Sequence, residues 1–378
     1  MTLSHCLKAK SLILATLITG IALVNHANAQ GHSYLIDLST RTVTDLGALG
    51  GSPTHATAIN DAGQVVGWAV TSDIGGSPGH AFITGPDGMG MRDLGTLGGD
   101  NSQASNINDA GQVVGDSSTG EGSHAFITGP DGMEMRDLGT LGGNHSGAYS
   151  INNVGQVVGW SGTADGYNFH AFITGANGMG MRDLGHFGGH IAIGQDINDA
   201  GQAVGDSYTV EGDFHAFITG PDGMGMRDLG TLGGDNSSAR GINDDGQVAG
   251  YSNTAEGDRH AFITGPGGMG MRDLGTLGGD ESIAFDINDA GQVVGWSVTD
   301  EGGAHAFITG PDGMGMMDLY SLVDLPEGVV LTMATDINNN GQVLVIGIIP
   351  EPETYALMLA GLGLVGFMAR RKKAEVRI

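Results

Sequence analysis

The sequence has very little cysteine and very little positive charge. Its single cysteine, Cys6, precedes the first apolar run, which excludes disulfides, cysteine-ligated zinc and thiol catalysis for the rest of the chain. Residues 30–349 hold 39 Asp and Glu against 8 Arg and no Lys, a net charge of −31. Because such an acidic surface repels polyanions, we predict no nucleic-acid partner.

Proline is also sparse, with 10 residues, whereas glycine is abundant, with 70. The glycines follow no Gly-X-Y period, which excludes a collagen-like chain. Apolar residues make up 40% of the sequence, which is enough for a hydrophobic core and disfavours an intrinsically disordered chain. The composition therefore predicts a folded protein.

The N-terminal end carries the three parts of a secretory signal peptide in order. Lys8 and Lys10 supply positive charge, residues 12–24 form an apolar run, and Ala27 and Ala29 frame a small-x-small cleavage site. The run is too short for a comfortable membrane span. We predict that residues 1–29 are a signal helix that directs export by the general secretion machinery, rather than a structural N-terminal helix.

The C-terminal segment, residues 350–378, contains different parts. Pro350, Glu351 and Pro352 end any strand, residues 355–369 are apolar and small, and a basic stop follows. A short helix that ends in positive charge inserts with that charge on the cytoplasmic side, and this run is shorter than the ~20 residues that span a bilayer comfortably. We predict a short hydrophobic helix that anchors transiently in the inner membrane, with a permanent single-span tail as the alternative. The basic stop consists of Arg370, Arg371, Lys372 and Lys373.

This tripartite segment resembles the PEP-CTERM sorting signal of Gram-negative bacteria. The resemblance covers about the last thirty residues and rests on Pro-Glu-Pro, the glycine-rich run 359–366 and the Arg-Arg-Lys-Lys stop. It implies recognition by an exosortase-type membrane protease, removal of the tail, and release or attachment at the cell surface. Proteins with this signal commonly occur in bacteria that make exopolysaccharide, which makes such a polymer an expected partner.

Between these segments, residues 30–349 repeat the string HAFITG at intervals of 44 to 46 residues. Asp-Leu-Gly recurs in six units, and an Ile-Asn pair followed by Gly-Gln recurs in all seven. Self-similarity at this period indicates a propeller, a solenoid or an array. The histidines that open the units are His32 (in the divergent copy HSYLID), His80, His124, His170, His215, His260 and His305.

Each unit carries the signals of four short strands. In the unit that begins at His124, HAFIT is β-prone, and residues 129–132, Gly-Pro-Asp-Gly, are expected to form a type I turn with proline in second position. Further strands are expected at 135–138, 148–151 and 156–158, with a tight turn at 152–155. Each unit is therefore predicted to contain two hairpins.

The predicted fold is all-β, with seven four-stranded repeats that form a seven-bladed β-propeller. One such small sheet cannot bury both of its apolar faces, whereas stacked neighbours bury them and ring closure removes the exposed ends. The last unit lacks an HAF strand, so residues 32–37 are expected to complete it and tie the chain ends together. An open β-solenoid is the competing fold.

The motifs are similar to those of the HAF-repeat family of extracellular bacterial proteins, named for His-Ala-Phe. The resemblance covers about 315 residues and implies an extracellular location without any established activity. The first unit departs from the pattern with Ser33 and Tyr34, and the last replaces Leu-Gly-Gly with the longer segment 320–335.

Few side chains carry a signal for chemistry. We expect each repeat histidine to hydrogen-bond a polar group such as the Asp of Asp-Leu-Gly, because single histidines on separate blades do not converge on a metal. Paired methionines after the turn are expected to pack, although thioethers also bind copper(I). The Asn-Asp-Ala-Gly turns lack the ligand series of a calcium loop. We predict no catalytic, cofactor or metal site.

The positions that differ between units are the better candidates for a ligand. Trp68, Trp160, Tyr251 and Trp296 follow the GQVVG-type strand at one repeat position, where flat aromatics near Asp and Asn suit glycan contact. The alternative is that they cap a strand end. We predict a non-enzymatic structural or adhesive component of the extracellular polysaccharide matrix, with a lectin-like propeller and a polysaccharide hydrolase or lyase as alternatives.

Overall fold

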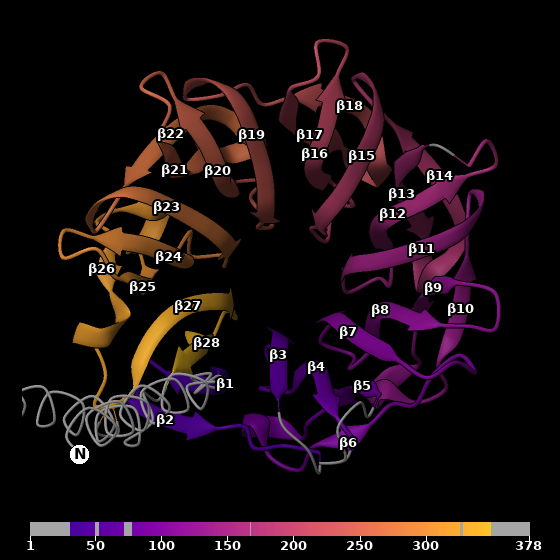
Figure 1. Ribbon diagram of the computed structural model, residues 1–378, viewed down its shortest axis with the longest axis horizontal. Coiled ribbons are helices and arrows are strands. Elements are labelled where there is room, and N and C mark those ends of the chain that lie inside the picture. The colour runs from indigo at the N-terminus through magenta and orange to yellow at the C-terminus, as the bar shows by residue number, and fades with distance from the viewer. Residues whose placement is uncertain (1–30, 50–52, 72–77, 167, 326–327, 349–378) are drawn as a thin grey trace, which may run out of the picture. The chain divides into compact units, whose positions relative to one another are not determined.

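The computed structural model describes residues 31–49, 53–71, 78–166, 168–325 and 328–348, which form one all-β unit built as a ring of blades (Figure 1). The β-propeller prediction is confirmed. The predicted signal peptide and sorting segment, with its hydrophobic helix, lie outside these residues. Within the described ranges no helix is long and apolar enough to cross a bilayer.

The ring consists of seven blades, each a set of four antiparallel strands, and single parallel pairs join blade 2 to 3, blade 3 to 4 and blade 5 to 6 (Figure 1). Blade 1 comprises β3 (Thr54–Ile59), β4 (Val65–Val70), β5 (Gly79–Ile83) and β6 (Arg92–Asp93), and blade 2 comprises β7 (Ser102–Ile107), β8 (Val113–Ser118), β9 (Ser123–Ile127) and β10 (Arg136–Gly139). Blade 3 comprises β11 (Gly142–Ile151), β12 (Val157–Thr163), β13 (Phe169–Gly175) and β14 (Met179–Gly185), and blade 4 comprises β15 (Gly188–Ile197), β16 (Ala203–Thr209), β17 (Phe214–Gly220) and β18 (Met224–Asp228). Blade 5 comprises β19 (Gly233–Ile242), β20 (Val248–Thr254), β21 (Arg259–Gly265) and β22 (Met269–Gly275), and blade 6 comprises β23 (Gly278–Ile287), β24 (Val293–Thr299), β25 (Ala304–Ile308) and β26 (Met317–Asp318).

Blade 7 is built from both ends of the described chain. Its strands are β27 (Val330–Ile337), β28 (Gln342–Ile348), β1 (Gly31–Asp37) and β2 (Thr42–Asp45), in that order from the ring centre outward. β1 pairs with β28 over seven residues, from Gly31 opposite Ile348 to Asp37 opposite Gln342. The expectation that the N-terminal strand completes the last blade is confirmed, and the open solenoid is excluded.

Neighbouring blades pack face to face through the apolar residues of the repeat. The phenylalanine of each HAF string is fully buried against the preceding blade; Phe126 of blade 2, for example, packs on Val66, Ala81 and Ile83 of blade 1. Burying a side chain of this size contributes roughly 1.5–3 kcal/mol. The blades therefore stabilise one another, which explains why a single unit does not suffice.

The turn after each HAF strand differs from its prediction. In blade 2, for example, the residues with left-handed backbone are Asp131 (φ 53°) and Gly132 (φ 66°), and the Met133 amide donates to the Pro130 carbonyl. These angles are typical of a type I′ turn centred on Asp-Gly, so the expected type I turn, with proline in second position, was wrong. A type I′ turn matches the right-handed twist of a hairpin, whereas a type I turn splays its strands.

Each inner strand contains a bulge at the same repeat position. In β11, for example, Ala148 pairs with Gly159 and Ser150 pairs with Val158, which leaves Tyr149 as the extra residue. At Gly159 an added Cβ would lie 2.0 Å from the carbonyl oxygen of Gly147. The glycine that ends the GQVVG string is therefore needed because the bulge brings the inner strand against it.

Candidate functional site

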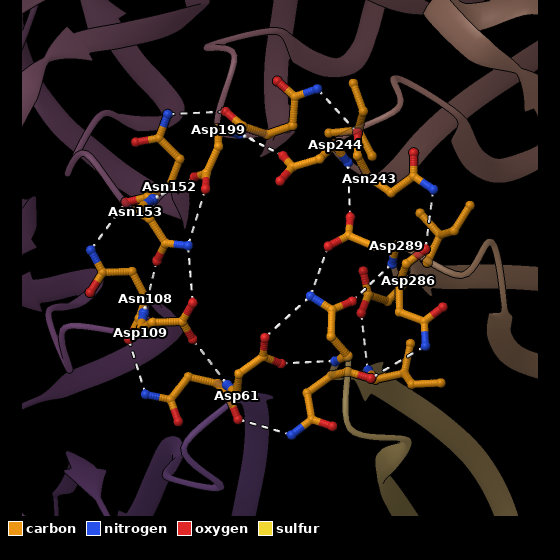
Figure 2. Close-up of a pocket in the computed structure, with 18 of the residues that line it drawn as sticks. Asp61, Asn108, Asp109, Asn152, Asn153, Asp199, Asn243, Asp244, Asp286 and Asp289 are labelled. Carbon is orange, nitrogen blue, oxygen red and sulfur yellow. Dashed lines mark hydrogen bonds between the residues drawn. The ribbon is translucent and has the colours of Figure 1, made fainter.

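One end of the central channel is lined by a ring of asparagines (Figure 2). In each blade the Asn of the Ile-Asn pair is buried, and its amide nitrogen donates to the backbone carbonyl of the corresponding Asn in the next blade at 3.0–3.3 Å. The bond from Asn338 to Asn60 links blade 7 to blade 1 and completes the circle. These residues are Asn60, Asn108, Asn152, Asn198, Asn243, Asn288 and Asn338.

The next residue of each blade forms a second ring, which consists of five aspartates and two asparagines. Each backbone amide donates to a side-chain oxygen in the following blade at 2.8–3.1 Å. The two asparagine amides each bridge two carboxylates and so relieve part of their repulsion. We call this set the Asx ring: Asp61, Asp109, Asn153, Asp199, Asp244, Asp289 and Asn339.

Behind these rings the channel holds a cavity of about 360 Å³, which we call the channel cavity. The bulge sends two successive side chains of each inner strand toward the centre, because an extra residue breaks the alternation of a strand. The bulged residues that line the cavity are Thr57, Ser105, Tyr149, Gln195, Arg240, Phe285 and Thr335. From the position after the bulge, Ala58, Asn106, Asp196, Asp286 and Asp336 also line it.

Three of these cavity residues are carboxyls held in inter-blade hydrogen bonds. Asp196 accepts the Ile242 amide at 2.8 Å, Asp286 accepts the Ile337 amide at 3.0 Å, and Asp336 accepts the Ile59 amide at 2.7 Å. In each case the acceptor lies in one blade and the donor in the next. The carboxyls therefore join blades 4 to 5, 6 to 7 and 7 to 1.

Burial in the channel makes ionisation of these carboxyls unfavourable. Desolvation, followed by repulsion from Asp286, raises the pKa of Asp196 to about 7. Desolvation and the adjacent Asp336 raise the pKa of Asp286 well above its ordinary value, and desolvation raises the pKa of Asp336. Near neutral pH the cavity therefore carries less negative charge than its sequence suggests.

We expect the free energy of unfolding to increase as the pH falls from 8 to 5. The three cavity carboxyls have higher pKa values in the folded chain than in the unfolded chain, so the folded chain keeps protons bound that the unfolded chain has released. The stabilisation that this proton binding provides is lost as the pH rises through the folded-state pKa, which is about 7 for Asp196. The variant Asp196→Asn mimics the protonated side chain and should lose its share of the pH dependence. Each pKa unit corresponds to about 1.4 kcal/mol.

Urea unfolding at several pH values between 5 and 8 measures this effect. Asp258→Asn is the matched control, because it removes the same charge from an exposed residue in the loop between β20 and β21. We expect Asp258→Asn to follow the pH profile of the parent. Identical slopes for the two variants between pH 6 and 8 would contradict the assignment.

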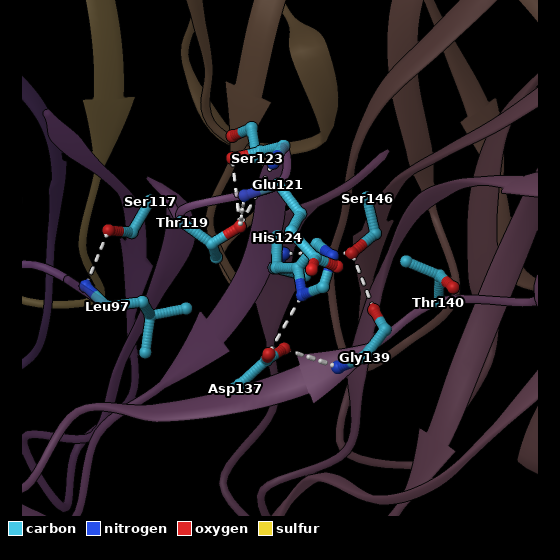
Figure 3. Close-up of polar contacts among 12 residues, drawn as sticks. Leu97, Ser117, Thr119, Glu121, Ser123, His124, Asp137, Gly139, Thr140 and Ser146 are labelled. Atoms are coloured by element: carbon cyan, nitrogen blue, oxygen red, sulfur yellow. Dashed lines mark hydrogen bonds and ion pairs between the residues drawn. The ribbon is translucent and has the colours of Figure 1, made fainter. Parts of the chain in front are cut away.

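Each repeat histidine lies on the third strand of its blade and points toward the aspartate of the fourth strand, as His124 of β9 does toward Asp137 of β10 (Figure 3). His124 Nδ1 is 2.8 Å from Asp137 Oδ2, and the Gly139 amide donates to the other carboxylate oxygen at 2.6 Å. Ser146 of the next blade then donates to the Gly139 carbonyl at 2.6 Å. The same His–Asp contact occurs at 2.6–2.9 Å in five other units, whereas His32 lies 3.9 Å from Asp45. This geometry gives the histidines a structural role.

The four aromatics proposed for glycan contact lie within the second strand of their blades and are half-buried. The Trp68 ring stacks on His55 with centroids 4.5 Å apart, and Trp160 meets the edge of Phe169 at 5.4 Å. Tyr251 lies between two guanidinium groups, those of Arg240 at 5.5 Å and Arg259 at 5.6 Å. Trp296 pairs with Ile283 and Ala306 in the sheet. Trp160 and Tyr251 reach the channel cavity indirectly, through Tyr149 and Arg240.

The paired methionines divide between packing and exposure, although both were expected to pack. The second of each pair lies against the core, as Met135 does beside Phe126. The first is 58–66% exposed in all six units. The intervening residue has positive φ, as Gly180 does at 66°, and this turns the two side chains apart. The exposed set is Met89, Met133, Met179, Met224, Met269 and Met314.

Within the described ranges no group of three or more His, Cys, Asp or Glu side chains is placed to hold a metal ion. The sequence did not lead us to predict the rings and the channel cavity, because Asn-Asp-Ala-Gly was assigned to turns alone. The signal that identifies them is the Ile-Asn pair, which recurs in all seven units. Its asparagine serves two purposes, since Asn60 Oδ1 accepts the Gln64 amide within the turn while Asn60 Nδ2 reaches the next blade.

Comparison with known proteins identifies a PEP-CTERM protein-sorting motif at residues 349–372. No curated protein matches the chain in sequence. The β-propeller domain of the trilobed protease from Pyrococcus furiosus is similar, with a TM-score of 0.53 and 13% identity over 75% of this chain and 83% of that one. A puromycin-hydrolysing peptidase from Mycobacterium tuberculosis gives a TM-score of 0.53 and 14% identity over 76% of this chain and 48% of that one.

TolB from Acinetobacter baumannii has a TM-score of 0.44 and 11% identity over 63% of this chain, which spans 62% of the TolB length. At these identities the two neighbours above 0.5 establish the β-propeller fold and nothing about activity. The sorting motif indicates an exported protein that is processed by exosortase-type machinery and directed to the cell surface.

Proposed function

We propose that this chain is a secreted or cell-surface propeller that serves as a non-enzymatic structural or adhesive component of the extracellular polysaccharide matrix. We also propose that it belongs with the HAF-repeat proteins, on the strength of the repeated HAFITG string. Its expected partner is the exopolysaccharide of a Gram-negative producer.

The observation that carries the proposal is where the ring ends in the sequence. Blade 7 is complete at Ile348, and the sorting motif begins at residue 349. Removal of the tail therefore takes no strand from the ring. The delivered product is a closed disc that repeats similar surface positions seven times, and repeated weak contacts with one polymer gain strength through avidity.

The surface charge limits the class of polysaccharide that this propeller can bind. A net charge of −31 over residues 30–349 repels polyanions over roughly 8–10 Å at physiological salt. The matching partner is a neutral polysaccharide, or an acidic one bridged by divalent cations. A lectin-like propeller is the second candidate function, and the varied lining of the channel cavity favours it.

Fractionation of the producing bacterium tests the proposal. We expect most of the chain to lie with the polysaccharide matrix and to enter the medium when the polysaccharide is stripped, because the polymer supplies its contacts. Chelator should release the chain only where the polymer is acidic. A chain that stays on stripped cells in undiminished amount contradicts a matrix role, and release of new reducing ends from the polymer by the purified protein identifies an enzyme instead.

A further inference from the structure

The blades differ most where they face the channel. The buried positions that join them are nearly uniform, with Ile-Asn in every blade and Phe in every HAF string. By contrast, the bulged position carries hydroxyl, phenol, amide, guanidinium and phenyl groups in different blades. A lining that only filled space would follow the repeat as the rest of the core does. The channel cavity is thus an asymmetric, chemically mixed part of a ring whose inter-blade contacts are regular.

Arg240 is the most informative member of this lining. Its guanidinium lies over the Tyr251 ring, but its Nε is buried and has no hydrogen-bond partner within the described part of the chain. Thr335 Oγ1, also in the lining, is buried without a partner there as well. Because buried polar atoms are nearly always hydrogen-bonded, these two groups leave unused hydrogen-bonding capacity in the wall of the cavity, as three threonine hydroxyls do elsewhere in the described residues.

The charge in the cavity indicates a neutral ligand. Arg240 supplies one positive charge, and Asp196, Asp286 and Asp336 resist ionisation because they are buried beside one another. The cavity therefore offers both donors and acceptors with little net charge near neutral pH. The Asx ring, which carries five carboxylates, lines one end of the channel and repels anions from it.

The shape of the lining indicates a ring-like, hydroxyl-rich molecule. Tyr149 of blade 3 and Phe285 of blade 6 lie three blades apart, on opposite sides of a seven-membered ring, so that aromatic side chains line the space from both sides. Between them stand Gln195 and Arg240, whereas blades 1 and 2 contribute only short side chains and leave room. A volume of about 360 Å³ is within the range of small-ligand sites.

We propose that the channel cavity binds a neutral sugar unit, held by Arg240 and Asp196 through its hydroxyl groups and flanked by Tyr149 and Phe285. The inference rests on the proposed function, since it names the place and the chemistry of polysaccharide recognition. A site that hydrogen-bonds hydroxyl groups discriminates strongly against analogues that lack them.

The test uses the purified full chain and neutral oligosaccharides cut from the producing bacterium's own polysaccharide, with spermine as a cationic probe. Calorimetry or ligand-observed NMR measures binding. We expect Arg240→Gln to weaken oligosaccharide binding at least tenfold. Ser105→Phe should abolish oligosaccharide binding, because the phenyl group fills the space that Ser105 leaves open in blade 2. The fold should be unchanged, since the same repeat position holds an aromatic residue in blades 3 and 6. Arg41→Gln, an exposed residue in the β1–β2 turn, removes the same charge and should bind as the parent does.

Several outcomes overturn the proposal. The site is wrong if neutral oligosaccharides fail to bind the parent, if Ser105→Phe binds them normally while its melting temperature is unchanged, or if spermine binds more tightly than every neutral sugar. Matrix retention separates this inference from the proposed function. Variants that lose oligosaccharide binding but stay in the matrix leave the structural role intact, whereas a parent chain that is never retained there removes both.

Discussion

Deletion of residues 31–45 is expected to unfold the whole ring rather than blade 7 alone. These residues supply β1 and β2, and β1 buries Tyr34, Leu35 and Ile36 almost completely. At roughly 1.5–3 kcal/mol for each large apolar side chain, the loss is on the order of 5–9 kcal/mol before any hydrogen bond is counted. Since a domain is stable by only about 5–15 kcal/mol, the remaining chain should be unfolded or open at 37 °C.

A circular permutant provides the matched control for this deletion. Gly31 lies directly opposite Ile348 in the β1–β28 pair, so a short hairpin linker can join Ile348 to Gly31 and place residues 31–45 after the ring. We expect this permutant to melt close to the parent, because it restores every strand pair of blade 7 and only moves the break in the chain from the β1–β28 pair to the connection between blades 7 and 1. Circular dichroism and calorimetry measure both variants.

The outcome distinguishes a closed ring from a stack of independent units. A closed ring loses cooperativity everywhere when one blade is half removed, because blade 7 then offers little surface to blades 6 and 1. A one-dimensional array would lose only its terminal contacts. If the chain without residues 31–45 melts within a few degrees of the parent, closure is not what stabilises this fold.

Repetition made the architecture predictable from the sequence. HAFITG, Asp-Leu-Gly and Ile-Asn mark three of the four strands in each unit, and the missing HAF strand of the last unit located the closing strand at residues 32–37. The Asp-Gly turn was misassigned because Pro130 suggested a type I geometry, although the hairpin twist demands positive φ at both central residues.

The candidate site was far less predictable. The sequence cannot show that Tyr149 is a bulged residue, and without the bulge a strict two-residue alternation places Tyr149 and Ser150 on opposite faces. Reasoning from the repeat therefore selected Trp160, which is half-buried beside Phe169, instead of its neighbour Tyr149 in the channel lining. The inter-blade bonds of the asparagines were equally hidden, since six of them join residues 44 to 50 positions apart and the closing bond, from Asn338 to Asn60, spans 278.

Replacing Pro350, Glu351 and Pro352 by alanine is expected to stop processing almost completely. The triplet lies within the sorting motif at residues 349–372, and we expect it to be the element that the protease recognises. The apolar run and the basic stop are untouched, so the variant should still insert. Full-length chain is therefore expected to accumulate in the inner membrane.

Immunoblotting of membrane, matrix and medium fractions with an antibody against the ring measures this result. Glu353→Ala is the matched control, because it removes a carboxylate next to the triplet and leaves the Pro-Glu-Pro element intact; we expect it to be processed normally. The ring itself should fold in both variants, since blade 7 ends at Ile348, ahead of the changed residues. Release of processed chain in normal amounts from the triple variant would show that the protease does not recognise Pro-Glu-Pro. Sorting would then depend on the hydrophobic run and the basic stop alone.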